Sequence, residues 1–207
     1  MKTLITLGGT REPVDAVRYL GNRSSGRMGV AIAAAAVEAG NEVTVVAGSV
    51  SVALPGDVEV VRVDTTRQMH DAVLERWPTC DALVMAAAVA DFRPKVVSDR
   101  KLHRDAGMTL ELEPTEDILA AAGACKRADQ TLVGFSLDDD TPEARERARE
   151  KLVRKNCDLL VYNPIATLDA NEVTATIFRR DGSSVDVPSS EKAAFAQRLI
   201  EEVIHHR

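Results

Sequence analysis

Six short runs of apolar, largely β-branched residues recur along the chain, and most are separated by segments with helical periodicity. The runs cover residues 3–7, 42–47, 58–63, 81–89, 131–135 and 158–162. Because they lack the polar alternation of a half-exposed sheet, we expect parallel strands covered by helices on both faces. The pattern therefore predicts an α/β fold with a doubly wound, mainly parallel sheet, a Rossmann-like three-layer sandwich.

The pattern changes after residue 163. Two runs, 173–180 and 184–187, flank Asp181-Gly182, which suits a tight turn, so we expect a C-terminal β-hairpin extension of the sheet. A helix is expected over 142–155 and a last one from 190 to about 204. Residues 92–115 are too polar and too numerous for an ordinary connection, and we interpret them as a mobile flap. No linker divides the chain, so one domain over 1–207 is predicted.

Composition narrows the class of protein. A net charge of −6 and 3% aromatic residues argue against a nucleic-acid-binding protein. Cys80, Cys125 and Cys157 form no Cys-x-x-Cys pair, so neither a disulfide framework nor a zinc knuckle is indicated. The apolar start is too short for a signal peptide and no run is long enough for a membrane span, so we expect a cytoplasmic protein without membrane partners.

The first predicted strand runs into the polar segments Gly8-Gly9-Thr10-Arg11-Glu12-Pro13 and Asn22–Gly29, and a small-residue helix follows. A strand, a glycine-containing loop and a helix present backbone N–H groups and a positive helix end to a phosphate. The glycine spacing fits neither the P-loop nor the dinucleotide fingerprint. Asn22, Ser24 and Ser25 add side-chain donors, so the loop predicts a phosphorylated ligand.

A basic stripe, Arg147, Lys151 and Lys155, repeats every fourth residue of the predicted helix over 142–155. A nucleotide triphosphate along the stripe would relieve the repulsion between these charges. The alternative is a solvated face neutralised by Glu143, Glu146 and Glu150, and the helix alone favours that alternative.

Two further candidates follow the strand over 81–89. Asp91, after three alanines, suits a ribose hydroxyl or a metal, or it caps a turn while the alanines pack a helix. Lys101 in the flap is placed to meet a developing phosphate oxyanion, or it is an ordinary exposed lysine. His70, His205 and His206 do not form a metal cluster and receive no role.

Taken in order, these segments resemble one family, phosphopantothenoylcysteine synthetase, the phosphopantothenate–cysteine ligase of coenzyme A synthesis. The matching residues are Gly9-Thr10-Arg11-Glu12-Pro13, Val17-Arg18-Tyr19, Asn22-x-Ser24-Ser25-Gly26-x-Met28-Gly29, Ala87-Ala88-Val89-Ala90-Asp91, Lys101, Asp117-Ile118, Val133-Gly134-Phe135, Lys151 and Lys155-Asn156-x-Asp158-Leu159. The resemblance implies a two-step reaction with CTP as co-substrate and Mg²⁺ or Mn²⁺ as cofactor. The carboxylate of 4′-phosphopantothenate attacks the nucleotide to release pyrophosphate, and the amine of cysteine then displaces CMP from the acyl-cytidylate.

The same resemblance implies residue roles. Asn22 and Lys101 would be catalytic. Substrate-binding residues would be Gly9, Thr10, Asn22, Ser24, Ser25 and Gly26, and nucleotide-binding residues would be Ala87, Asp91, Lys101, Glu116, Asp117, Ile118, Leu119, Phe135, Lys151 and Lys155. Assigning Lys151 and Lys155 to the triphosphate reverses the interpretation of the stripe as a solvated face. No metal ligands are singled out.

The resemblance also implies a homodimer and an association or fusion with a flavin-dependent decarboxylase. The chain departs from the family pattern at Glu116, where proline is usual, at Leu102-His103-Arg104 in the flap, and at Tyr162-Asn163-Pro164. Two other functions remain as alternatives. One is an NAD(P)-dependent Rossmann oxidoreductase, which the missing glycine fingerprint disfavours, and the other is a non-catalytic nucleotide-binding module.

Overall fold

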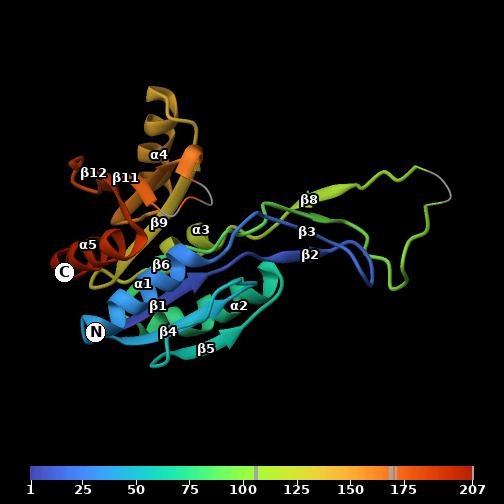
Figure 1. Cartoon of the computed structure of the whole chain (residues 1–207), viewed down its shortest axis with the longest axis horizontal. Helices are drawn as coiled ribbons and strands as arrows, with labels where there is room; N and C mark the ends of the chain where they lie inside the picture. The colour runs from blue at the N-terminus through green and yellow to red at the C-terminus, as the bar shows by residue number, and fades with distance from the viewer. Residues whose placement is uncertain (105–106, 168–169, 171, 207) are drawn as a thin grey trace.

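The computed structural model describes residues 1–104, 107–167, 170 and 172–206. In this part of the chain, eight strands form a central sheet in the order β12-β11-β10-β9-β6-β1-β4-β5 (Figure 1). The strands are β1 (Lys2–Leu7), β4 (Glu42–Ala47), β5 (Glu59–Arg62), β6 (Ala82–Met85), β9 (Thr131–Asp138), β10 (Leu159–Pro164), β11 (Glu172–Arg179) and β12 (Ser184–Glu191). Neighbouring strands pair in parallel from β5 to β10, and β11 is antiparallel to β10 and β12.

Helices cover both faces of the sheet, which confirms the predicted doubly wound architecture. One face packs on α1 (Arg27–Glu38) and α5 (Lys192–His205), and the other packs on α2 (Thr66–Arg76), α3 (Ile118–Ala124) and α4 (Pro142–Arg154). Successive side chains of a strand point to opposite faces. Accordingly, Ile5 of β1 belongs to the core beneath α1 and α5, whereas Leu4 belongs to the core beneath the other three helices.

Local signals set where several helices begin. The Thr65 hydroxyl accepts from the Gln68 amide in a complete capping box before α2, and Thr141 caps α4 with Pro142 in its first turn. Asp117 caps α3 by accepting from the Ala120 amide at 2.9 Å. Short 3₁₀ turns, η1 (Trp77–Thr79) and η2 (Ile165–Thr167), follow α2 and β10.

Several predicted boundaries need correction. The strand expected to reach residue 89 ends at Met85, because the chain beyond it leaves the sheet and keeps a single bridge from Ala88 to Gly9. β9 and β10 extend beyond their predicted ends to Asp138 and Pro164, and they pair with each other along this added length. β12 continues to Glu191, so the last helix begins at Lys192 rather than at residue 190.

Two antiparallel hairpins project from the sheet as a long arm (Figure 1). One pairs β2 (Arg11–Pro13) with β3 (Tyr19–Gly21), and sequence analysis missed it. The other pairs β7 (Phe92–Pro94) with β8 (Leu112–Pro114), so the expected irregular flap has regular pairing at its base. Residues 105 and 106 of that flap lie outside the described residues. Among the described residues, no helix combines the length and apolar character needed to cross a membrane.

Candidate functional site

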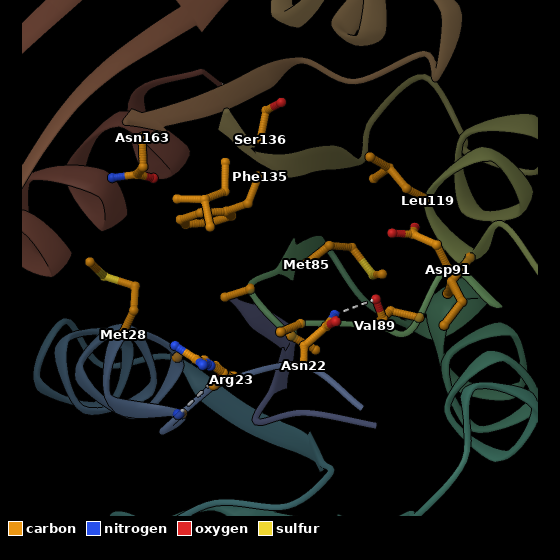
Figure 2. A pocket seen from close by; sticks show the side chains of 18 of the residues that line it. Asn22, Arg23, Met28, Met85, Val89, Asp91, Leu119, Phe135, Ser136 and Asn163 are labelled. Carbon is orange, nitrogen blue, oxygen red and sulfur yellow. Dashed lines mark hydrogen bonds between the residues drawn. The ribbon is translucent and has the colours of Figure 1, made fainter. Parts of the chain in front are cut away.

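A cavity of about 970 Å³ opens beyond the carboxyl ends of the central strands (Figure 2). Its walls come from the loop before α1, the segment after β6, the start of α3, β9, and the end of α4. The chain passes from β1 to β4 on one side and from β6 to β9 on the other, so β1 and β6 flank a topological switch point. Ligands of open α/β sheets bind at such points.

At the start of α1, no side chain caps the first backbone N–H groups of the helix. Gly26 precedes the helix at φ 77°, in the left-handed region that glycine adopts without strain. Gly29 brings α1 close to the central strand, since a Cβ atom there would lie 2.3 Å from Leu7 Cβ. Residues 22–29 all line the cavity, so the positive end of α1 faces it.

Asn22 lies on this wall, opposite the segment that follows β6 (Figure 2). Its Nδ2 donates to the carbonyl of Val89 at 2.9 Å, which fixes the direction of the amide group. Ala87 and Asp91, from the same segment as Val89, also line the cavity. The structure thus brings the predicted amide and the predicted nucleotide contacts together.

The predicted basic stripe needs a correction. Lys151 and Lys155 line the cavity, but Arg147 does not; it pairs with Asp138 of β9 at 2.8 Å. Arg154, which the four-residue spacing overlooked, joins the two lysines at the cavity. The end of α4 therefore supplies three cations to one wall.

The two lysines of this wall differ in their surroundings. Lys151 Nζ donates to the Phe135 carbonyl at 2.7 Å, and burial lowers the pKa of Lys151 while Cys157 and Asp91 act against that effect. Lys155 forms an ion pair with Asp117, the residue that caps α3. A triphosphate would therefore compete with Asp117 for Lys155.

Glu116, Asp117, Ile118 and Leu119, which were predicted to bind nucleotide, all line the cavity. The Glu116 carboxylate, however, is bound to Arg93 and Arg67. Burial acts to raise the pKa of Glu116, but hydrogen bonds from its own amide and from Arg93 outweigh it, and the pKa lies below its usual value. This carboxylate stays ionised and engaged with protein groups at neutral pH.

Gly9 and Thr10 line a smaller adjoining cavity of about 380 Å³, which shares Asn22, Ser24 and Ser25 with the first. The Thr10 hydroxyl is buried, where it accepts from the Ala90 amide at 2.8 Å and lies 3.1 Å from the Thr66 hydroxyl. These contacts connect the loop after β1 to the segment after β6 and to α2, and the predicted substrate-binding role of Thr10 stays a prediction.

Lys101 is exposed and is not among the described residues that line either cavity. The neighbouring Leu102 is held by the other hairpin: its amide donates to Asp15 at 3.0 Å and its carbonyl accepts from Arg18 at 2.7 Å. The role of Lys101 in nucleotidyl transfer stays a prediction.

Sequence reasoning also missed polar lining residues on the far side of the cavity. Asn163 of β10 lines the cavity and donates from Nδ2 to the Thr174 carbonyl at 3.2 Å. Tyr162, its neighbour, points into the core on the other face of the sheet. Alternate residues of a strand face opposite sides of the sheet. Had the strand been predicted to continue to residue 164, Asn163 and Tyr162 would have been placed on opposite faces.

Side chains that could ligate a metal are sparse in the described residues, where no group of three His, Cys, Asp or Glu side chains is suitably placed. Cys80 and Cys157 are buried, and burial raises the pKa of Cys157 to about 12. Cys125, after the last turn of α3, is exposed. The cavity can thus offer cations, side-chain amides and carboxylates, and its cations suit a phosphorylated ligand.

Comparison with known proteins gives a consistent family. Residues 1–206 match the model of the DNA/pantothenate metabolism flavoprotein C-terminal domain. Coenzyme A biosynthesis bifunctional protein CoaBC of Mycobacterium bovis is 39% identical over 216 residues, covering 98% of this chain and 52% of that protein. A cysteine/cysteine sulfinic acid decarboxylase from an unknown prokaryotic organism is 44% identical over 166 residues, 79% of this chain and 46% of that protein.

A crystal structure of the C-terminal domain of CoaBC superposes with a TM-score of 0.84 at 36% identity, covering 98% of this chain and 93% of that one. The chain spans about half the length of the curated relatives that it matches.

Proposed function

Because the chain belongs to the family of DNA/pantothenate metabolism flavoprotein C-terminal domains, we propose that it is a phosphopantothenate–cysteine ligase of coenzyme A biosynthesis. The observation that carries the proposal is the larger cavity described above, which combines the Asn22 amide with Lys151, Arg154 and Lys155. The name of the Mycobacterium bovis relative supports the pathway, and its description as bifunctional supports a second activity in the remainder of such proteins.

In the first step, the carboxylate of 4′-phosphopantothenate attacks the α-phosphate of CTP, and pyrophosphate leaves. The cations at the end of α4 hold the triphosphate, so that charge moving onto the leaving oxygens meets fixed positive groups. Lys155 exchanges its ion pair with Asp117 for the phosphates. Lys101 adds a positive charge at the transferred phosphate when the flap closes, as the resemblance implies.

In the second step, the amine of cysteine attacks the acyl carbon, and CMP leaves with the former carboxylate oxygen on its phosphate. The amine loses a proton and the product amide forms. Asn22 is a neutral donor held by Val89 beside this reaction, so it stabilises the tetrahedral oxyanion without titrating.

Mg²⁺, or Mn²⁺ in its place, supplies neutralisation of phosphate charge when bound. The described residues fit an ion that enters with the nucleotide. They form no three-ligand cluster, and Glu116 and Asp117, which line the cavity with Asp91, are paired with basic side chains. Asp91 then has either the ion or the ribose as its partner.

Pyrophosphate release tests the proposal. The purified chain is mixed with Mg²⁺ and CTP or ATP, first with 4′-phosphopantothenate alone and then with cysteine added. We expect pyrophosphate release that depends on phosphopantothenate. Without cysteine it should stop at about one equivalent per protein chain, and with cysteine it should continue over many turnovers, faster with CTP than with ATP. Tight triphosphate binding without release would replace the ligase with a nucleotide-binding module.

The same samples test the other candidates. Carbon dioxide released from cysteine without nucleotide would favour the decarboxylase activity named for the second relative. Saturable binding of NADPH would favour an oxidoreductase, whereas a ligase is expected not to bind NADPH. Light scattering of the same preparation tests the homodimer that the family resemblance implies.

A further inference from the structure

Three consecutive residues connect the β7–β8 hairpin to α3, and each contacts a different element beside the cavity. The Thr115 amide donates to the Asp91 carbonyl at 3.0 Å, and its hydroxyl donates to the Ala90 carbonyl at 2.6 Å. Asp117 pairs with Lys155 at the end of α4. Glu116, between them, joins the hairpin to α2 through two arginines.

The Glu116 contacts converge on one carboxylate. Arg93 of β7 donates from Nη1 to both oxygens at 3.0 and 3.2 Å, and from Nε to Glu113 of β8 at 2.8 Å. Arg67, in the first turn of α2, reaches the same carboxylate at 3.0 Å. Only 18% of the Glu116 side chain and 29% of the Arg93 side chain are exposed, so this part of the network is less screened than a surface ion pair.

We propose that Glu116 is a positioning residue, which fixes the base of the β7–β8 hairpin and the adjoining Asp117–Leu119 wall so that the cavity accepts its nucleotide. This inference rests on the proposed function and deepens it. Both carboxylate oxygens are bound to arginine, and a free carboxylate in this place would repel a triphosphate. Glu116 therefore acts through the wall and not by touching the nucleotide.

Glu116→Gln removes the charge while keeping the size and a hydrogen-bonding oxygen. The matched control is Glu111→Gln, because Glu111 pairs with Lys95 in the same hairpin but is 74% exposed and does not line the cavity. Hydrogen bonds to charged groups are stronger than those between neutral groups, and the partial exposure of Glu116 moderates their contribution. We expect Glu116→Gln to raise the KM for CTP roughly tenfold with kcat changed less than about twofold.

Two further measurements separate positioning from general stability. Hydrogen exchange of the amides in residues 112–117 should quicken in Glu116→Gln and not in Glu111→Gln. Arg93→Gln should raise the KM similarly. The double variant Arg93→Gln/Glu116→Gln should raise it by less than the product of the two single effects, because both substitutions remove the Arg93–Glu116 interaction, while only one of them removes Arg93–Glu113 and only the other removes Arg67–Glu116.

Equal KM values and equal exchange in Glu116→Gln and the unmodified chain would overturn the inference, as would an equal effect of Glu111→Gln. Loss of kcat without change in KM would also overturn it, since Glu116 would then serve the chemical step. If the unmodified chain releases no pyrophosphate, the proposed function fails separately, and the CTP dissociation constant from calorimetry replaces KM in the comparison.

Discussion

Gly29→Ala tests whether the close approach of α1 to β1 is a requirement of the fold. The added Cβ would lie 2.3 Å from Leu7 Cβ and 3.2 Å from Leu7 Cα. Carbon atoms need about 3.5 Å, so α1 must move outward by about 1 Å. Leu7 is fully buried in a central strand and has no room to move away. The loss in the free energy of unfolding should therefore lie near the upper end for overpacking, about 3 kcal/mol.

Alanine is also the better helix former, by about 1 kcal/mol. The net loss in the free energy of unfolding is therefore about 2 kcal/mol, equivalent to roughly 4–8 °C in Tm for a chain of this size. Fluorescence of Trp77, which is the one tryptophan and fully buried, follows unfolding directly.

Gly56→Ala is the matched control, because a Cβ there has no atom within 4 Å and its φ lies outside the left-handed region. We expect a change of less than about 0.5 kcal/mol for this variant. Identical melting curves for Gly29→Ala and Gly56→Ala would refute the packing argument. A lower Tm for Gly29→Ala with unchanged CTP affinity would support the packing argument. It would also show that the start of α1 keeps its position at the cavity in the folded variant.

Three substitutions test the proposed roles at the cavity. Asn22→Asp puts a negative charge where an oxyanion develops, so amide formation should fall at least tenfold more than pyrophosphate release; equal losses would count against the role. Lys101→Gln should suppress pyrophosphate release about a hundredfold, and an unchanged burst would remove Lys101 from the mechanism. Lys151→Ala should weaken CTP binding at least tenfold more than CMP binding, as calorimetry can measure, whereas equal weakening would indicate a folding effect.

The sheet was predictable because most of its parallel strands are buried runs of apolar residues. The run over 42–47 coincides with β4, and all six predicted parallel strands are present in the order of a doubly wound fold. The two hairpins of the arm were not predictable in the same way. Each pairs strands of three residues, three of the four strands contain proline and a charged residue, and all four contribute little to the core, so hydrophobic periodicity does not mark them.

Site residues that belong to sequence motifs could be predicted. Contacts between residues from separate elements could not. Ordered motifs placed Asn22 and Asp91 at the cavity, and the family match over residues 1–206 confirms the resemblance. Arg147 was wrongly predicted to face the ligand, because its partner Asp138 lies on another element. The ion pairs of Glu116 with Arg67 and Arg93 likewise join residues whose sequence spacing does not indicate a contact. Tertiary contacts decided these cases.

The contrast among the three cysteines makes the chain a substrate for selective labelling. A maleimide dye reacts with thiolate, and the buried Cys157 thiol, with its pKa of about 12, is almost entirely protonated at neutral pH. Cys80 is buried and its pKa is also raised, which leaves the exposed Cys125 as the reactive position. Because Cys125 follows the last turn of α3 and Asp117 caps its first, one dye attached without any mutation would report on the helix whose opposite end lines the cavity.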